Sequence, residues 1–145
     1  AEKVKELDLK YIMWPYCNIE ILYLQGKYEE ALSLSEEAIK NFNDPMYYGI
    51  KGFILGELNR KEEALSVIKA LEKMSSERNI RNQYIYMINY SIGDYDSALN
   101  SLNEDFEKNL FNTFIFDPRL YWVKLHDNEK FKKIFLNFGL PLKPL

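Results

Sequence analysis

The sequence contains one short segment in three related copies: 26-GKYEEAL-32, 59-NRKEEAL-65 and 93-GDYDSAL-99. The Ala-Leu pair that ends each copy begins at residues 31, 64 and 98, so consecutive copies lie 33 and 34 residues apart. A regular interval of about 20 to 50 residues is typical of repeat proteins, in which each repeat is one supersecondary unit. The sequence therefore predicts a series of similar, stacked units.

Helical periodicity accounts for the residues around the three copies. Apolar residues recur at the i, i+3, i+4 spacing of an α-helix, and no alternation of useful length indicates a strand. Each copy begins with a residue that tolerates a positive φ angle, namely Gly26, Asn59 or Gly93. We therefore predict helices joined in pairs by tight turns, over residues 12–25, 28–41, 45–58, 61–74, 79–92 and 95–109.

Small residues follow each predicted turn. Ala31, Ala64 and Ala98 stand five residues after the turn residue. A small side chain at this position lets the second helix of a pair pack closely on the first. Gly52 supplies matching space in the middle pair.

Composition limits the class of protein. The chain has 145 residues, of which 47% are hydrophobic, so it is long enough for one globular domain with a sizeable core. Its net charge of -3 and its pI near 5.3 argue against a binder of nucleic-acid phosphates, which needs a concentrated basic face. No apolar run approaches the roughly 20 residues of a membrane span. We therefore expect a cytoplasmic protein that contacts neither nucleic acid nor membrane through this domain.

Residues 12–109 resemble tetratricopeptide (TPR) repeats, whose helix pairs recur about every 34 residues. The best single set of matching residues is Tyr48, Gly52, Asn59 and Ala64. The resemblance implies an all-α, right-handed TPR superhelix, an α-α solenoid, of about three repeats with a C-terminal capping helix pair. The single domain 1–145 would comprise the end of a preceding repeat (1–11), three repeats (12–44, 45–78 and 79–111) and the cap (112–145).

The first residues suggest that the repeats continue upstream. Val4 and Leu7 share one face of the predicted opening helix, and a solenoid buries such a face against a neighbouring unit. We therefore expect the chain to be a fragment of a longer protein.

The C-terminal part is similar to the ends of TPR regions in microbial modular regulators. In those proteins the repeats follow a winged-helix, nucleotide cyclase or kinase domain. The similarity rests on Asp117-Pro118, on the segment that ends in Phe131, and on 138-FGLP-141. It implies a regulatory arm rather than a catalyst.

The last predicted helix has one apolar face, formed by Phe131, Ile134, Phe135 and Phe138. Asp127 is expected to cap its start, as Asp117 is expected to cap the helix that begins at residue 118. The simplest interpretation is a cap over the third repeat. A basic helix on a membrane surface and a dimer interface are the alternatives.

Candidate catalytic and metal-binding residues are few. The chain has one histidine, His126, and one cysteine, Cys17, which stand near opposite ends of the sequence. Cys17 lies among apolar residues and is expected to be packed. The sequence contains neither a clustered set of metal ligands nor a glycine-rich phosphate loop. We therefore expect no enzymatic activity, no metal and no cofactor.

In TPR proteins the first helix of each repeat lines a concave surface. Carried over to this chain, that geometry selects a set rich in aromatic residues and methionine, which is typical of surfaces that bind a peptide or helix. The predicted partner-binding groove is lined by Met13, Tyr16, Glu20, Tyr23, Gly49, Phe53, Gly56, Gln83, Met87 and Tyr90.

The predicted function is non-catalytic protein–protein interaction. The chain would be the regulatory or scaffold arm of a larger signalling or transcription regulator, with a protein or peptide as its partner. Self-association as a homodimer and sensing of a small apolar ligand between repeats are the alternatives. In so short an array, the protein's own tail or upstream helices can also fill the groove.

Overall fold

The computed structural model describes residues 2–110 and 117–142, with side chains from Met13 onward. Every regular element in these ranges is helical, which confirms the predicted all-α class. The elements are α1 (Glu2–Leu24), α2 (Tyr28–Phe42), α3 (Pro45–Glu57), α4 (Lys61–Ser75), α5 (Asn82–Ser91), α6 (Tyr95–Glu107), α7 (Pro118–Tyr121), the 3-10 helix η1 (Val123–Leu125) and α8 (Glu129–Asn137).

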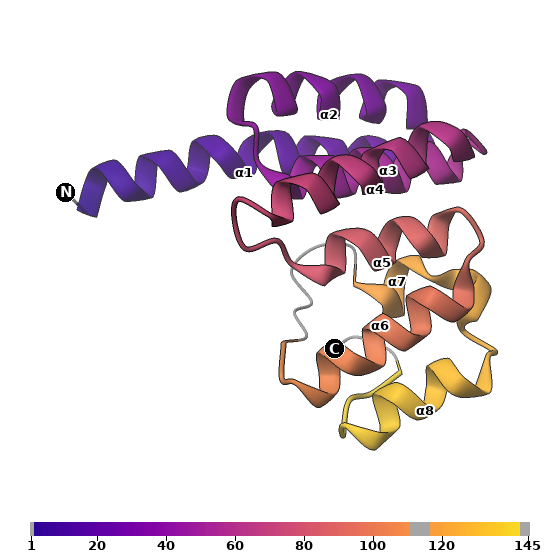
Figure 1. The fold of residues 1–145 in the computed structure, drawn as a ribbon. Helices are drawn as coiled ribbons and strands as arrows, with labels where there is room; N and C mark the ends of the chain where they lie inside the picture. Colours follow the sequence, from indigo (N-terminus) through magenta and orange to yellow (C-terminus); the bar gives the residue numbers. More distant parts are fainter. Residues whose placement is uncertain (1, 111–116, 143–145) are drawn as a thin grey trace.

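The helices stack in chain order. From α1 through α6, each helix packs on its neighbour in the chain. In addition, α3 packs along α5, and α8 packs on α6. Figure 1 shows this progression, with α1 and α2 at one end and α8 at the other. Buried apolar side chains form one cluster that includes Tyr16 in α1 and Phe135 in α8. A single core therefore connects the first helix to the last.

The three turns that begin the repeated segments have the same geometry. Gly26, Asn59 and Gly93 have φ angles of 74°, 59° and 86°, as predicted for residues of this type. In each turn the next amide donates a hydrogen bond of 2.9 Å to the carbonyl five residues before it, as from Lys27 to Leu22. This bond defines a Schellman motif, which requires a left-handed residue at the turn. The three copies are therefore equivalent in structure as well as in sequence.

Side-chain caps start α3, α6, α7 and α8, and that of α6 is Asp94, which accepts from the Ser97 amide. Asp44 accepts a hydrogen bond of 2.8 Å from the Met46 amide, and Asp117 accepts one of 2.9 Å from the Arg119 amide. The predicted cap at Asp127 is wrong. The N-cap of α8 is Asn128, whose extended backbone lets its side chain accept from the Phe131 amide at 3.1 Å.

The first helix differs from its predicted division. Residues 1–11 were predicted to be separate from a helix over 12–25, whereas α1 continues without a turn from Glu2 to Leu24. No turn interrupts this stretch. Pro15 lies inside the helix, where its lack of an amide hydrogen removes one backbone hydrogen bond. The N-terminal part of α1 extends beyond the other helices (Figure 1). The boundary predicted between residues 111 and 112 lies outside the described residues.

Three glycines bring α3 and α5 close together. A Cβ atom added at Gly49 would lie 2.9 Å from the Cβ atom of Tyr84, and one added at Gly56 would lie 2.8 Å from the carbonyl carbon of Ser91. A Cβ atom at Gly52 would lie 2.7 Å from the Cγ1 atom of Ile88. At Gly49 and Gly56 a side chain would meet the backbone or a Cβ atom of α5, whereas at Gly52 it would meet the flexible end of Ile88. The glycines therefore set the separation of the two helices.

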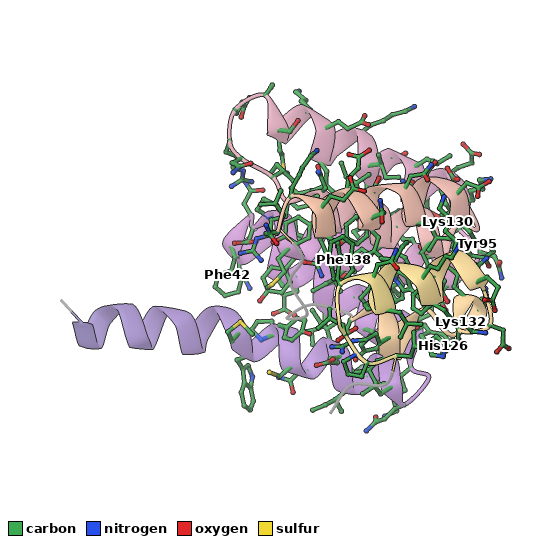
Figure 2. All side chains as sticks on the ribbon, turned by 90° about the horizontal axis from the view of Figure 1, so that it is seen from below. Phe42, Tyr95, His126, Lys130, Lys132 and Phe138 are labelled. Carbon is green, nitrogen blue, oxygen red and sulfur yellow. The ribbon has the colours of Figure 1, made fainter. Side chains whose placement is uncertain are left out.

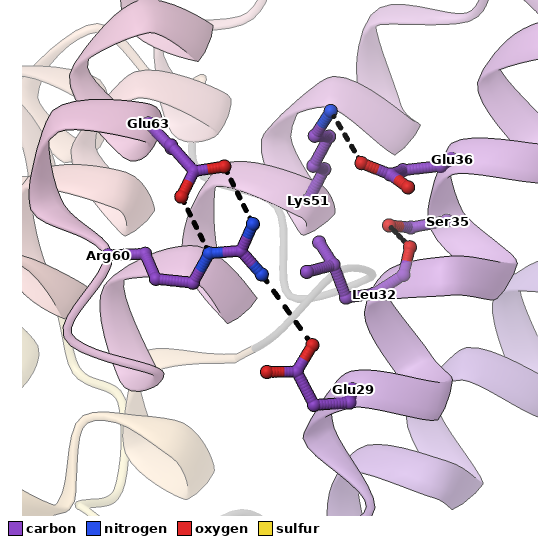
Figure 3. Close-up of polar contacts among 7 residues, drawn as sticks. All are labelled: Glu29, Leu32, Ser35, Glu36, Lys51, Arg60 and Glu63. Carbon is purple, nitrogen blue, oxygen red and sulfur yellow. Dashed lines mark hydrogen bonds and ion pairs between the residues drawn. The ribbon is translucent and has the colours of Figure 1, made fainter.

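Charged side chains link α2 to α3 and to the start of α4 at the surface (Figure 3). The Arg60 guanidinium lies 2.7 Å from Glu63 and 3.5 Å from Glu29, so it connects the start of α4 to α2. Lys51 and Glu36 form a second pair at 2.9 Å between α3 and α2. Exposed pairs of this kind contribute little to stability. Apolar packing is therefore the main source of order between the helices.

We predict that Gly56→Ala lowers the free energy of unfolding by about 1–3 kcal/mol, because the new methyl group meets the α5 backbone. Gly52→Ala should cost less, since its closest neighbour is the flexible end of Ile88. Urea denaturation of both variants and the wild type measures the difference. Equal or greater stability of Gly56→Ala would contradict the close contact of α3 with α5.

Candidate functional site

The predicted groove residues occupy one side of α1, α3 and α5, but most of them do not face solvent. Met13, Glu20 and Tyr23 are half-buried. The other seven are buried, and Phe53 has 0% of its surface exposed. The buried members are Tyr16, Gly49, Phe53, Gly56, Gln83, Met87 and Tyr90.

The segment Asp117–Leu125, which contains α7 and η1, contacts Glu20, Tyr23 and Tyr90 of this set. We call this segment the strap. Its Trp122 is fully buried and stacks on Tyr90, with ring centroids 4.9 Å apart and an interplanar angle of 4°. The same indole meets Tyr86 edge-on, with ring centroids 5.8 Å apart. The strap therefore binds α5 through its largest side chain.

Tyr121, the neighbour of Trp122, points to the other end of the surface. Its hydroxyl donates a hydrogen bond to Glu20 of α1, and its ring centroid lies 5.7 Å from that of Tyr23. Tyr23 in turn lies 5.5 Å from Phe53 and donates a hydrogen bond of 3.5 Å to Glu57. The two aromatic side chains of the strap thus contact opposite sides of one surface.

Four aromatic residues form this surface, which we call the aromatic face: Tyr23, Phe53, Tyr86 and Tyr90. Phe53 and Tyr90 stack with ring centroids 6.3 Å apart, so α3 and α5 present a continuous aromatic layer. Close approach of these helices, which the glycines of α3 permit, places the rings within reach of each other.

The Tyr90 hydroxyl binds the backbone of the strap. It donates a hydrogen bond of 3.3 Å to the Tyr121 carbonyl and accepts one of 3.4 Å from the Lys124 amide. Burial raises the pKa of Tyr90 to about 12, so the hydroxyl stays neutral and can act as both donor and acceptor. One side chain thus satisfies two main-chain groups of a segment far from it in sequence.

Two carboxylates lie beside the aromatic face. Burial raises the pKa of Glu57, and the nearby Lys124 partly opposes this shift. Glu20 accepts from Tyr121, whose own pKa is raised chiefly by burial and further by this hydrogen bond. Both carboxylates therefore serve as hydrogen-bond acceptors for tyrosine hydroxyls at the edge of the face.

An ion pair lies within the first residues of the strap. The Arg119 guanidinium contacts the Asp117 carboxylate at 2.7 Å and lies over the Phe135 ring, 5.9 Å from its centroid. Because Asp117 also caps α7, one carboxylate serves both the helix start and the ion pair. The guanidinium thereby joins the start of the strap to α8.

The structure corrects the prediction of an open groove. Phe53 is part of the core, and Gly49 and Gly56 lie in the contact with α5 instead of forming a groove floor. Glu20, Tyr23 and Tyr90 are contacted by Tyr121 and Trp122 of the protein's own C-terminal part. Tyr121 and Trp122 are absent from the predicted set. An aromatic pair within the first turns after an Asp-Pro helix start is a signal that could have indicated them.

Other candidate residues lie away from the aromatic face. Cys17 is exposed on α1, contrary to the predicted packing. His126 is exposed ahead of α8 and lies at the edge of the molecule (Figure 2). The described residues contain no group of three or more side chains placed to hold a metal ion. In the same ranges, no helix has the length and apolar character that crossing a membrane requires.

One hollow of about 500 Å³ lies at the start of α5. Of the predicted groove residues it contains only Gln83, and its lining includes the polar side chains of Asn79, Arg81, Asn82 and Asp105. Ile80 and Leu110 also line it, so the hollow is mixed in polarity.

Comparisons with protein-family models, curated proteins and solved structures give no match to this chain. The geometry of the aromatic face and the strap is therefore the basis of the functional argument.

We predict that Phe53→Glu unfolds the protein or lowers its free energy of unfolding by more than about 4 kcal/mol, because it places a charge in the core. Trp14→Glu is the matched control, since the Trp14 side chain is 71% exposed. Circular dichroism during thermal unfolding distinguishes the two variants. A folded Phe53→Glu protein of wild-type stability would show that Phe53 is accessible.

We also predict loss of stability at alkaline pH. Burial raises the pKa values of Tyr47 and Tyr90 to about 12, above the value near 10 expected in the unfolded chain. The resulting stabilisation is fully present below about pH 10 and is lost as the pH rises towards 12. Tyr90→Phe should therefore show a shallower decrease in unfolding free energy between pH 9.5 and about 11. Equal slopes in urea titrations of the two proteins would contradict this assignment.

Proposed function

We propose that this chain is a TPR-like solenoid module whose function is non-catalytic binding of a protein or peptide. The observation that carries the proposal is the way in which the aromatic face holds the strap. Tyr23 of α1 contacts Tyr121, Tyr86 and Tyr90 of α5 contact Trp122, and the Tyr90 hydroxyl bonds to the strap backbone. A surface of this kind can recognise a short segment by its backbone and by two side-chain anchors.

The solenoid assignment is supported by the repeated turns. The three Schellman turns recur with the interval of the sequence repeat, and α1 to α6 pack in chain order. Each unit of such an array contacts chiefly its neighbours, so the array provides an extended side surface. The aromatic face lies across three successive first helices of the proposed repeats.

In this proposal the chain is the regulatory or scaffold arm of a larger signalling or transcription regulator in the cytoplasm. Its partner is a protein or peptide segment, not nucleic acid or membrane. Apolar burial supplies the driving force, at about 25 cal/mol per Å² before the costs of association are subtracted. No metal, cofactor or reacting group is needed for this mode of action.

The test is affinity capture from source-cell lysate with the full chain, followed by titration of each captured protein in purified form. Met13→Glu changes the half-buried edge of the predicted groove, whereas Trp14→Glu changes the exposed side of the same helix. We expect Met13→Glu to weaken binding by at least about tenfold and Trp14→Glu to leave it unchanged. Equal affinities of the folded variants, or no partner at all, would contradict the proposal.

Self-association is a second candidate, because one side of α1 is apolar and uncovered. Trp14, Ile21 and Leu24 are 71%, 51% and 68% exposed, and the exposed Cys17 shares their side of the helix. These side chains carry no charge, so a second copy would meet them without like-charge repulsion. Sedimentation equilibrium would then show a dimer that Trp14→Glu dissociates. A monomer at all concentrations would exclude this candidate.

A further inference from the structure

We propose that the strap is an internal ligand, which a partner segment with the same chemistry displaces from the aromatic face. The partner would carry two adjacent aromatic residues, Tyr-Phe or Tyr-Trp, on a backbone that bonds to Tyr90. This inference rests on the proposed function and adds to it both the kind of partner and a means of regulation.

The strap depends on the aromatic face for its conformation. α7 comprises four residues and η1 three, so neither has enough internal hydrogen bonds to be stable alone. The Tyr121 carbonyl and the Lys124 amide of the strap both bond to the Tyr90 hydroxyl. The strap is therefore held as a bound peptide is held, through contacts with a preformed surface.

The strap contacts α8 as well as the aromatic face, because the ring centroid of Trp122 lies 6.4 Å from that of Phe131 and Arg119 lies over Phe135. α8 also has contacts of its own with α6. Phe135 of α8 packs edge-on against Phe106 of α6, with ring centroids 5.3 Å apart. Lys130 of α8 donates a hydrogen bond of 2.6 Å to Asn100 of α6. Figure 2 shows Lys130 on α8 and Phe138 directly after this helix. These contacts with α6 hold α8 in place when the strap leaves, although release also breaks the strap's contacts with Phe131 and Phe135.

The Trp122 contact with the aromatic face is incomplete. The indole N–H is buried and has no hydrogen-bond partner among the described residues. Burial of an unsatisfied donor opposes binding, although the stacked ring favours it. A competing segment with phenylalanine at this position keeps a stacking ring without burying an unpaired donor. The strap is therefore replaceable by a close relative of its own sequence.

The Tyr121 hydroxyl provides a contact that can be removed without removing the ring. It donates to the carboxylate of Glu20, and hydrogen bonds to charged groups are stronger than neutral ones. Tyr121→Phe should weaken the strap and leave Glu20 free to accept from the tyrosine of a competing segment. The apparent affinity of a competitor rises with the fraction of molecules whose strap is released.

The experiment uses the full chain with Trp14→Phe, so that Trp122 is the only tryptophan. The probe is a fluorescein-labelled synthetic nonapeptide with the sequence of residues 117–125 and phenylalanine in place of tryptophan. Fluorescence anisotropy gives its affinity, and Trp122 emission reports whether the strap leaves its buried site. Tyr48→Phe is the matched control, because its hydroxyl bonds to Asn43 on the surface.

We expect saturable binding together with a red shift of Trp122 emission. Tyr121→Phe should strengthen binding about tenfold, and Tyr48→Phe should leave it unchanged. Absence of binding up to ~1 mM in all three folded chains would show that the strap is permanent core. Binding without a change in Trp122 emission would also overturn the proposal.

The capture experiment separates the two proposals. If Met13→Glu selectively loses a captured partner while the probe never displaces Trp122, the interaction function stands and the strap mechanism is wrong. If the probe displaces Trp122 but capture finds no partner, strap exchange is supported and the proposed function is not.

Discussion

Three glycines of α3 let the backbone of α5 approach closely, and the aromatic face depends on this approach. With a side chain at Gly49 or Gly56, the two helices would have to separate. A Cβ atom at Gly49 would meet the Cα and Cβ atoms of Tyr84, and one at Gly56 would meet the carbonyl carbon and Cβ atom of Ser91. Separation would move Tyr90 away from Phe53 and break the stacked layer. The packing of α3 on α5 thus determines the geometry of the surface that the strap covers.

Tyrosines suit this surface because each has an apolar ring and a polar tip. The rings of Tyr23 and Tyr90 pack on Phe53, while their hydroxyls bond to Glu57 and to the strap backbone. Burial keeps the hydroxyls neutral, since it disfavours the phenolate. The face can therefore bury apolar area and still satisfy the main chain of the segment that lies on it.

Local signals in the sequence predicted most of the helices and their turns. Gly26 and Gly93 mark positions that need a left-handed backbone, and Asp44 with Pro45 marks a helix start. Where two local signals compete, the outcome was harder to predict: Asp127 and Asn128 are both good caps, and the backbone angles select Asn128. The residues predicted to line a groove lie on α1, α3 and α5, but most of them are buried. Their burial was not predicted, because exposure depends on what covers a surface.

The sequence by itself determined the all-α class, the repeat interval and the cap helix α8, since each follows from residues within a few turns of one another. Tertiary structure alone decided that the strap covers the aromatic face. The decisive contacts join Tyr121 to Glu20 and Trp122 to Tyr90, which are 101 and 32 residues apart in the chain. Helical periodicity does not encode such distant pairings, because they arise only when α1, α3 and α5 stand side by side.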